Sequence, residues 1–253
     1  MIVVRIYGGL GNQLFQYYFG QYLKACYQTD VFYDLSYFKI DNYRKPSILN
    51  FSFDLDLYEI QEGNKNVVPF KSFRANKIFN LLTLNKQYHT KFDKELKMDK
   101  TKTHYFDGYW QSLSFISSFE GNLDFEPKTK TKHLIELAKQ INSYPESIAI
   151  HIRRTDYLTP KNRKIFKEVG LNYYRKAIEF MQSELGEQIK FFVFSDDLEW
   201  SKKHMSFLNN PTWVEKGEDY EDLYLMAMCK HQITANSTFS WWAAMKNPYQ
   251  KKR

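Results

Sequence analysis

Hydrophobic and polar positions follow strand and helix periods in turn along this 253-residue chain. A short apolar run over residues 2–7 is followed by a glycine turn, and then by apolar residues three and four positions apart. That spacing predicts a helix with one buried face, formed by Leu14, Phe15, Tyr18, Phe19, Tyr22, Leu23 and Cys26. A second apolar run, at 31–33, ends at Asp34. The order of strand, turn, helix and strand is typical of the start of a Rossmann-like domain.

The alternation is most regular in the C-terminal part of the chain. Helical periodicity separates four apolar runs, which predict strands at 148–153, 190–195, 212–214 and 231–235. Because strands that alternate with helices form parallel sheets, this part is also predicted to be an α/β domain. We place the boundary at the turn around Pro145, which gives an N-terminal domain over 1–143 and a C-terminal domain over 144–253.

The middle third of the chain is less regular. Residues 40–105 mix short aromatic clusters with lysines, so we expect short helices and loops there. Residues 106–111 have the composition of a strand end followed by a helix start, and apolar positions between 134 and 141 predict a helix that links the two halves. Cys26 and Cys229 lie in apolar helical patterns, so both are expected to be core residues without a disulfide.

Composition narrows the range of partners. The formal net charge is +7 and 18% of the residues are aromatic, which favours an anionic ligand and provides rings for stacking. Lysines are spread over the whole chain, so a solvated surface accounts for most of that charge. The N-terminus lacks the apolar stretch of a signal peptide, and no run reaches the ~18 apolar residues of a membrane span. We therefore expect a soluble, cytoplasmic protein.

The strand at 148–153 ends in two adjacent arginines, Arg153 and Arg154, which are soon followed by Asp156. Functional residues of open α/β sheets gather at the carboxyl ends of the strands. A guanidinium carries a permanent charge and binds phosphate oxygens through two parallel hydrogen bonds, so the pair suits a diphosphate. The alternative is a surface ion pair between an arginine and Asp156, and this segment alone favours neither.

A second polar cluster follows the strand at 231–235, where Asn236, Ser237 and Thr238 precede an apolar helix. Ser237 or Thr238 is expected to cap that helix, because a hydroxyl accepts from a free backbone N–H in the first turn. A helix start also binds anions through its free N–H donors and its dipole. Such a hydroxyl is usually only a cap, but two polar clusters at strand ends of one α/β unit favour a nucleotide site.

The glycine turn near the N-terminus fits only part of the dinucleotide fingerprint. Gly9 and Gly11 match its first two glycines, whereas Leu14 stands where the third is required. The segment is either a plain tight turn or a binding loop that presents Asn12 and Gln13 at the helix N-terminus.

Two acidic pairs allow a functional and a structural interpretation. Asp196 and Asp197 follow the strand at 190–195. A carboxylate there could accept two N–H bonds from guanine, and one of the two is expected to cap the next helix. Asp54 and Asp56 match the acidic triplet with which many sugar transferases bind a divalent metal, but they alternate with apolar residues as on an exposed strand, which we favour. The histidines and cysteines show no metal-ligand spacing.

Four segments, in order, resemble one known family: GGLGNQLFQY at 8–17, HIRRTDY at 151–157, FSDD at 194–197 and NSTFSWW at 236–242. Together they are similar to bacterial α-1,2-fucosyltransferases of glycosyltransferase family 11, and related α-1,6- and protein O-fucosyltransferases share the H-x-R-R-x-D core. The resemblance implies an α/β fold of the GT-B type, with two Rossmann-like domains that face each other across a cleft. It also implies GDP-β-L-fucose as donor, a galactoside 2-hydroxyl as acceptor in O-antigen synthesis, inversion at the anomeric carbon and no metal.

The same resemblance assigns roles to single residues. The donor-binding residues would be His151, Arg153, Arg154, Asp196, Ser237, Thr238 and Ser240. The residues on the fucose or acceptor side would be Gly11, Asn12 and Gln13. Among these, Arg153 would hold the β-phosphate with help from Arg154 and neutralise the leaving group. His151 and Asp196 would contact guanine.

In this interpretation the transition state resembles an oxocarbenium ion, with positive charge on the sugar and negative charge on the departing GDP. Two guanidiniums and a helix N-terminus can stabilise that negative charge in place of a metal ion. Inversion also requires either a base for the acceptor hydroxyl proton or late proton loss to a phosphate oxygen. Asp156 and Asp34 are both candidates for the base, although orienting an arginine is the favoured role for Asp156.

Partners and location follow from the same resemblance. We expect GDP-fucose and a galactose-containing glycan, including a lipid-linked one, and no nucleic acid. Peripheral association with the inner face of the membrane is compatible with the positive charge. Family members usually continue beyond the position of Arg253, so a C-terminal segment is expected to be missing, and with it either part of the acceptor wall or helices that latch the domains together.

Three alternatives stay open on the sequence. A metal-dependent nucleotide-sugar transferase of another class would use Asp54 and Asp56. A non-catalytic, basic nucleic-acid-binding protein would account for the charge and the aromatic residues, although most of these residues fall at helical core spacing. A transferase that binds GDP-fucose without turnover is the third.

Overall fold

The structure is a computed structural model. It describes residues 1–58, 86–88, 98–99, 101–117, 123, 125–160, 162–164, 169–186 and 188–253. Within them the chain forms two compact units, each with its own sheet. Much of the segment 40–105, for which the sequence predicts short helices and loops, lies outside the described residues.

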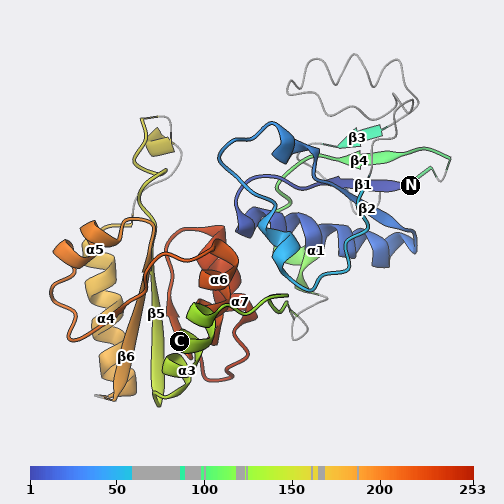
Figure 1. Ribbon diagram of the computed structural model, residues 1–253. Helices are drawn as coiled ribbons and strands as arrows, with labels where there is room; N and C mark the ends of the chain where they lie inside the picture. Colours follow the sequence, from blue (N-terminus) through green and yellow to red (C-terminus); the bar gives the residue numbers. More distant parts are fainter. Residues whose placement is uncertain are drawn as a thin grey trace. The chain divides into compact units, whose positions relative to one another are not determined.

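The first unit comprises Met1–Leu49 and Phe53–Asn122, and its parallel sheet has the order β2-β1-β4-β3 (Figure 1). The strands are β1 (Ile2–Arg5), β2 (Val31–Asp34), β3 (Lys86–Tyr88) and β4 (His104–Phe106). The helix α1 (Leu10–Tyr27) connects β1 to β2, and the short 3-10 turns η1 (Ser36–Lys39) and η2 (Ser47–Asn50) follow. The predicted strand-turn-helix-strand beginning is confirmed.

The helix α1 packs through most of the predicted apolar face. Leu14, Phe19 and Leu23 are fully buried, and the Phe19 ring contacts that of Phe106 in β4. Cys26 is exposed instead, so its prediction as a core residue is wrong. Lys24 and Ala25 before it are exposed as well, because the apolar period of a helix does not reveal where its covering layer ends.

The segment after β4 follows the prediction only in part. The strand ends at Phe106 as expected, but within the described residues 107–117 the only helical turn is η3 (Leu113–Phe115), which Ser112 caps. Trp110 lies before it with φ at 53° and stacks on Phe19, with 4.4 Å between the ring centres.

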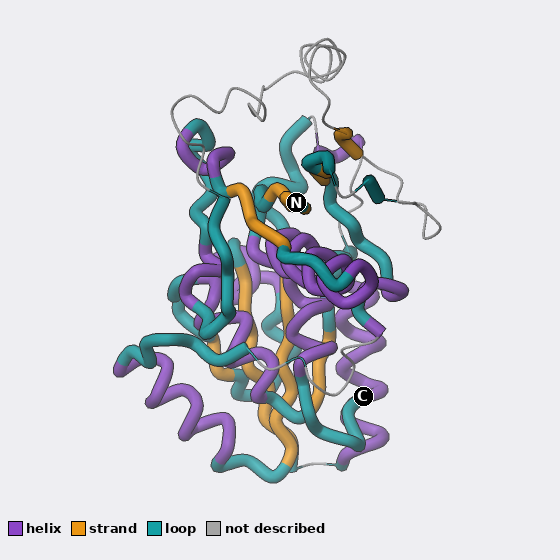
Figure 2. The backbone as a smooth tube through the Cα atoms, turned by 90° about the vertical axis from the view of Figure 1, so that its right-hand side faces the viewer, coloured by secondary structure: helices purple, strands orange, loops and turns teal. Residues whose placement is uncertain are grey.

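The second unit comprises Asn50–Ser52 and Leu123–Arg253, and its sheet has the order β7-β6-β5-β8. Its parallel strands are β5 (Glu146–Ile152), β6 (Ile189–Ser195), β7 (Thr212–Trp213) and β8 (His231–Ile233). Its helices are α3 (Lys132–Asn142), α4 (Leu171–Leu185), α5 (Leu198–His204), α6 (Asp219–Met228) and α7 (Thr238–Lys246). Figure 2 shows these strands side by side among the helices. All four predicted strands are confirmed.

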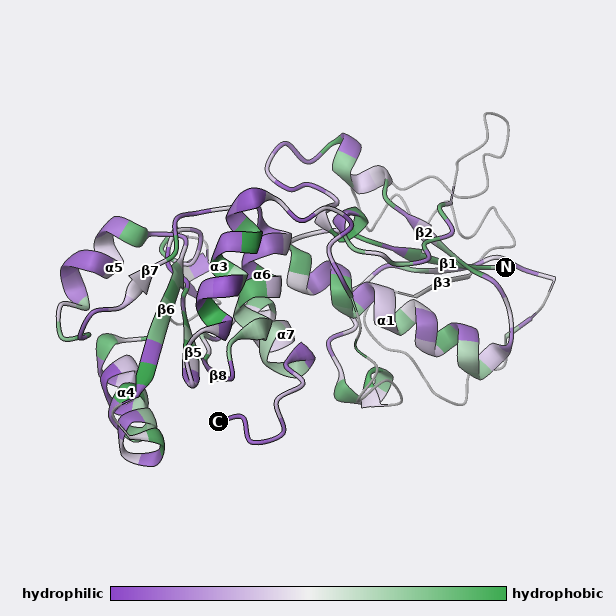
Figure 3. Ribbon diagram, turned by 60° about the horizontal axis from the view of Figure 1, so that its bottom comes forward, coloured by the Kyte–Doolittle hydropathy of each residue, from purple (hydrophilic) through white to green (hydrophobic). Residues whose placement is uncertain are grey.

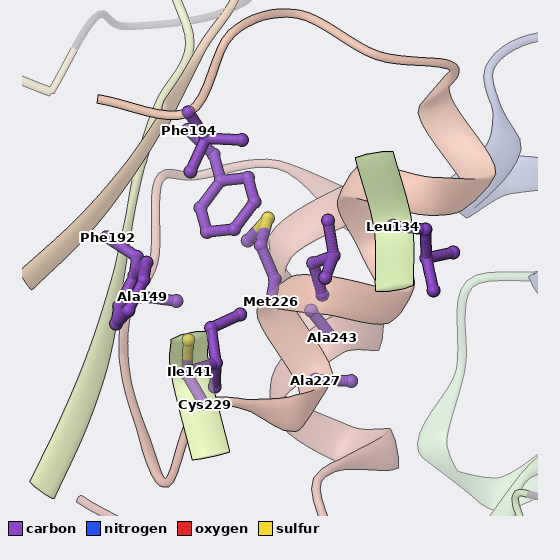
Figure 4. Packing of buried hydrophobic residues seen from close by; sticks show 11 residues of the cluster. Leu134, Ile141, Ala149, Phe192, Phe194, Met226, Ala227, Cys229 and Ala243 are labelled. Atoms are coloured by element: carbon purple, nitrogen blue, oxygen red, sulfur yellow. The ribbon is translucent and has the colours of Figure 1, made fainter. Parts of the chain in front are cut away.

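Helices cover both faces of the second sheet, as a parallel sheet requires. Successive residues of β5 point to opposite cores: Ala149 packs with α3, α6 and α7, whereas Ile150 packs with α4 and α5 (Figure 4 shows the first core). Cys229 lies fully buried in the first of these cores, as predicted. In Figure 3, α4 carries both hydrophobic (green) and hydrophilic (purple) residues, as expected of a helix with one covered face.

The helix α3 belongs to the second unit. Its residues Leu134 and Ile141 are buried in the same core as Ala149 and Phe192. The compact units therefore divide at Asn122–Leu123, before α3, whereas the sequence favoured a boundary at 143–144 after it. Among the described residues, no helix has both the length and the apolar character that a membrane crossing requires.

Candidate functional site

The carboxyl ends of three neighbouring strands bring the predicted donor-site residues of the second unit together. Arg153 and Arg154 follow β5, Asp196 follows β6, and Ser237 follows β8 and precedes α7. Since β5 lies between β6 and β8 and all three run parallel, these segments share one edge of the sheet. Open α/β sheets bind ligands at this edge.

Arg153 is held in place by two carboxylates. Its Nη2 donates to Oδ2 of Asp156 at 2.7 Å, and its Nη1 lies 3.3 Å from Oδ2 of Asp196. Burial disfavours the charged guanidinium, but the hydrogen bond to Asp156 and the charge of Asp196 raise the pKa of Arg153 above its ordinary value. The side chain stays 23% exposed, so a fixed positive charge remains accessible at the edge.

Arg154 has different surroundings. Its guanidinium carbon lies 3.4 Å from the centre of the Trp200 ring, and its Nε lies 3.5 Å from Oδ2 of Asp197. Trp200 in turn stacks on the imidazole of His204, 4.3 Å away. The side chain of Arg154 is only 11% exposed. The two adjacent arginines thus differ, because Arg154 is packed onto α5 and Arg153 is not.

Asp196 organises the segment that follows β5. Its Oδ1 accepts from the backbone N–H of Arg154 at 2.8 Å, and its Oδ2 accepts from the Thr155 hydroxyl at 2.6 Å and from the Thr155 N–H at 3.2 Å. These bonds and the ion pair with Arg153 occupy the carboxylate that the sequence assigned to guanine. Asp197 caps α5 by accepting from the Trp200 N–H, which confirms that one aspartate of the pair is a cap.

The start of α7 is tied to the arginine segment through Tyr157. The phenol donates to the Asn236 carbonyl oxygen at 3.0 Å and is also hydrogen-bonded to the Ser237 hydroxyl. The guanidinium carbon of Arg153 lies 5.9 Å from the centre of the Tyr157 ring. The cation and the helix start therefore lie close together. In the sequence, Tyr157 stood out only as the last residue of the HIRRTDY segment.

Ser237 is the N-cap of α7, as the sequence predicts, because its Oγ accepts from the Phe239 N–H. Thr238 is the first residue of the helix and is half-buried. Ser240 is fully buried, and its hydroxyl donates to the carbonyl oxygens of Ala235 and Ser237. Ser240 therefore fixes the turn before α7 rather than offering an exposed hydroxyl.

His151 lies beneath the same helix start. Its side chain is buried, and its ring centre lies 5.4 Å from that of Phe239 in α7. Burial, with a contribution from the Arg153 charge, lowers the pKa of His151 to about 3. The imidazole is therefore neutral at physiological pH, and its buried Nδ1 has no hydrogen-bond partner among the described residues.

The three predicted residues of the first unit lie at the start of α1, in different environments. Gly11 is buried. Asn12 is half-buried, and its Oδ1 accepts from Nε2 of Gln111 at 2.8 Å. Gln13 is only 1% exposed; its Nε2 donates to two carbonyl oxygens, and its Oε1 accepts from the Ile48 N–H. Gln13 thus connects the loop around Lys45 and Ile48 to the glycine turn. Of the three predicted residues, only Asn12 presents an accessible side chain.

Asp222 is a candidate that sequence reasoning missed. It lies in the first turn of α6, where its Oδ1 is closed off from solvent and its carboxylate accepts from the Gly217 backbone N–H. Burial, with the neighbouring charges of Asp219 and Glu221, raises the pKa of Asp222 to about 7. Strongly shifted carboxylates cluster at functional sites. The available sequence signal was the cluster of four acidic residues within 218–222, at the start of an apolar helix.

The acidic triplet of the first unit does not form a metal site in the described part of the chain. Asp54 and Asp56 are both exposed, and the Asp56 backbone carbonyl accepts from the Tyr33 N–H. No group of three His, Cys, Asp or Glu residues within the described ranges could hold a metal ion.

Comparison with known proteins places the chain in a family. The model of the family described as "Glycosyl transferase family 11" matches residues 69–248. The "O-antigen biosynthesis glycosyltransferase WbnK" of Escherichia coli is 31% identical over 277 residues, covering 97% of this chain and 90% of that protein. An "Alpha-1,2-colitosyltransferase" of Escherichia coli is 31% identical over 266 residues, covering 98% and 88%.

Among solved structures, the fucosyltransferase NodZ from Bradyrhizobium superposes with a TM-score of 0.58 at 14% identity, covering 96% of this chain and 90% of NodZ. This likeness confirms the predicted fold, an α/β fold of the GT-B type with two parallel sheets. The chain therefore belongs to glycosyltransferase family 11 and is an enzyme of that family.

Proposed function

We propose that this enzyme transfers L-fucose from GDP-β-L-fucose to the 2-hydroxyl of a galactoside, with inversion at the anomeric carbon. The observation that carries the proposal is the guanidinium of Arg153, which Asp156 and Asp196 hold beside the capped start of α7. A fixed cation next to the positive end of a helix dipole can bind a diphosphate without a metal ion. The names of relatives add support: one is an α-1,2-colitosyltransferase, and NodZ is an α-1,6-fucosyltransferase co-crystallised with GDP.

In the proposed step, the bond between C1 of fucose and the β-phosphate oxygen breaks, and its electron pair leaves with GDP. The 2-oxygen of the acceptor forms the new bond to C1 from the opposite face. Arg153 and the N–H groups at the start of α7 stabilise the negative charge that grows on the leaving phosphate. Arg154, stacked on Trp200, adds positive charge behind it.

The acceptor proton leaves late, to a phosphate oxygen, in this proposal. Both carboxylates considered as the base already have partners. Asp156 pairs with Arg153, and buried Asp34 accepts from the Tyr105 hydroxyl at 2.6 Å and from the Ser36 N–H at 2.8 Å. Asp156 is therefore assigned to orienting Arg153, the role that the sequence favoured for it.

Guanine recognition is assigned to the same edge of the second sheet. A carboxylate oxygen can accept from the N–H groups of guanine, and we assign this role to Asp222 in the first turn of α6. The neutral His151 ring lies beneath the start of α7 as an uncharged surface. Asp196 then serves the donor indirectly, by holding the segment that carries both arginines.

The acceptor is proposed to be a galactose-containing precursor of a surface glycan, such as a lipid-linked O-antigen unit. The relative WbnK is named for O-antigen biosynthesis, which supports this class. A net charge of +7 favours peripheral association with an anionic membrane surface, where such an acceptor would lie.

Incubation of the chain with GDP-fucose and methyl β-D-galactopyranoside tests the proposal. We expect GDP release together with a 2-O-fucosylated galactoside, identified by NMR, and slower GDP release when the galactoside is omitted. Absence of both reactions would overturn fucosyl transfer. Binding of GDP-fucose without any release of GDP would favour the alternative of a transferase without turnover.

Colitosyl transfer is a second candidate, favoured by the 31% identity to an α-1,2-colitosyltransferase. Colitose is fucose without the 3-hydroxyl, so the same phosphate-binding residues serve both donors. A comparison of kcat/KM for GDP-fucose and GDP-colitose on one acceptor decides between them, and a higher value for GDP-colitose would replace fucose in the proposal.

A further inference from the structure

Three charged residues form a row at the carboxyl edge of the first sheet. Arg5 ends β1, Asp34 ends β2, and Asp107 follows β4, in a register that aligns all three. Nη1 of Arg5 donates to Oδ2 of Asp107 at 3.0 Å, and both side chains are largely buried. Because a buried ion pair can often be replaced by apolar residues without loss of stability, packing alone does not explain this row.

A layer of tyrosine rings covers the row. The guanidinium carbon of Arg5 lies 5.3 Å from the ring centre of Tyr37 and 5.9 Å from that of Tyr7. Tyr7 also packs against Tyr109, with 4.9 Å between ring centres. Tyr109 is the outermost ring and is 48% exposed, so it presents aromatic surface to solvent directly above charged and hydroxyl groups.

Polar groups surround the exposed ring. A Cβ at Gly8, which has φ at +79°, would lie 3.6 Å from the Tyr109 ring and 3.3 Å from the Asn12 amide, so the glycine turn packs beside both. Asn12 accepts from Gln111, and the Asp107 side chain is 14% exposed. An exposed ring with a few placed amides and a carboxylate suits a neutral ligand that has an apolar face and several hydroxyls.

The two sheet edges therefore differ in chemistry. The edge of the second sheet presents the accessible cation Arg153, which suits a phosphate. The edge of the first sheet presents Tyr109, while Asp107 already neutralises its cation Arg5. A glycosyltransferase needs a site for an uncharged sugar in addition to one for the nucleotide.

We propose that Tyr109 is the stacking surface for the galactose ring of the acceptor, with Asp107 and the Asn12–Gln111 pair binding its hydroxyls. This inference rests on the proposed fucosyl transfer and adds residues for acceptor specificity. The apolar C–H face of the pyranose lies on the phenol ring, and the hydroxyls around it reach the amides and the carboxylate.

Steady-state kinetics of Tyr109→Ala, Tyr109→Phe and Tyr109→Trp, with methyl β-D-galactopyranoside and GDP-fucose, test the inference. For Tyr109→Ala we expect the acceptor KM to rise about tenfold, which corresponds to about 1.4 kcal/mol. Phe and Trp keep the stacking face, so the acceptor KM should stay near that of the unaltered chain. The donor KM and the slow hydrolysis of GDP-fucose without acceptor should not change in any of them.

Tyr43→Ala is the matched control, because Tyr43 is 94% exposed in the same unit and takes no part in the tyrosine layer. Saturation-transfer NMR of methyl β-D-galactopyranoside with the Ala variant reports on binding even if turnover is lost. An unchanged acceptor KM, or an equal rise in the donor KM, overturns the inference while leaving fucosyl transfer intact. If the unaltered chain neither hydrolyses GDP-fucose nor transfers fucose, the result is different, because it overturns the proposed function itself and this inference with it.

Discussion

The guanidinium carbon of Arg154 lies 3.4 Å from the centre of the Trp200 ring, closer than any contact that Arg153 makes with a ring among the described residues. The same Trp200 donates its backbone N–H to Asp197, and Asp197 lies 3.5 Å from the Arg154 Nε. The first turn of α5 thus holds Arg154 from two sides. Arg153, the more exposed of the two, is left to meet a ligand.

Trp200→Leu is expected to loosen Arg154 and to raise the KM for GDP-fucose more than it lowers kcat. Loss of a cation–π contact of this kind should reduce the free energy of unfolding by about 0.5–2 kcal/mol. Trp200→Phe retains a ring face and should recover part of both effects. Urea unfolding and donor kinetics measure the two, with exposed Phe180→Ala on α4 as control. A donor KM unaffected by Trp200→Leu would show that α5 does not position Arg154 for the donor.

Arg153→Ala is expected to lower kcat by about 10²–10³, the range for loss of one preorganised group that stabilises developing charge. Arg153→Lys should recover turnover only in part, because an ammonium lacks the planar fork that meets Asp156 and a phosphate together. Arg175→Ala removes an exposed arginine of the same unit, on α4, and should leave kcat unchanged. Nearly normal turnover by Arg153→Ala would remove the cation from the mechanism.

Asp196→Asn separates a positioning role from direct guanine recognition. We expect a loss of about 1.5–3 kcal/mol in the free energy of unfolding, because the carboxylate accepts from Arg154 and Thr155 and pairs with Arg153. The preference for GDP over ADP as a competitive inhibitor should persist, whereas Asp222→Asn should weaken it. Inhibition constants for both nucleotides measure the preference. Loss of guanine preference in Asp196→Asn alone would return that role to Asp196.

The sequence predicted the location of the site better than the direction of its side chains. Strand periodicity and turns rich in glycine or hydroxyl-bearing residues are local features of a sequence. The positions of Arg153, Asp196 and Ser237 at the carboxyl ends of strands were therefore predictable. What Gln13 does depends on partners far along the chain, the Lys45 carbonyl and the Ile48 N–H. No local pattern encodes such partners, and for the same reason the sequence could not show that Asp196 is already engaged.

Chelation by EDTA is expected to leave fucosyl transfer unchanged, because Arg153 and the start of α7 supply the positive charge that a metal would otherwise provide. The variant Asp54→Asn with Asp56→Asn should likewise keep its kcat, since both side chains are exposed on the first unit. The test compares initial rates of fucosyl transfer before and after dialysis against EDTA, with and without added Mn²⁺. Strict dependence on Mn²⁺, lost in the double variant, would favour a metal-dependent transferase instead.

His151 is expected to make the protein sensitive to acid. Burial and the Arg153 charge lower the pKa of His151 to about 3 in the folded chain, whereas in the unfolded chain the imidazole takes up its proton near the ordinary pKa of 6.5. Above pH 6.5, His151 should therefore not affect the free energy of unfolding. Between pH 6.5 and the lowered pKa, the free energy of unfolding should fall by up to about 1.4 kcal/mol for each unit that the pH decreases. Urea unfolding of the unaltered chain and of His151→Phe, at several values in the window between the two pKa values, isolates this slope. His204→Asn, on partly exposed α5, controls for the loss of an imidazole. Equal slopes for the unaltered chain and His151→Phe would mean that His151 accepts its proton in the folded state, and that the start of α7 tolerates a second positive charge beside Arg153.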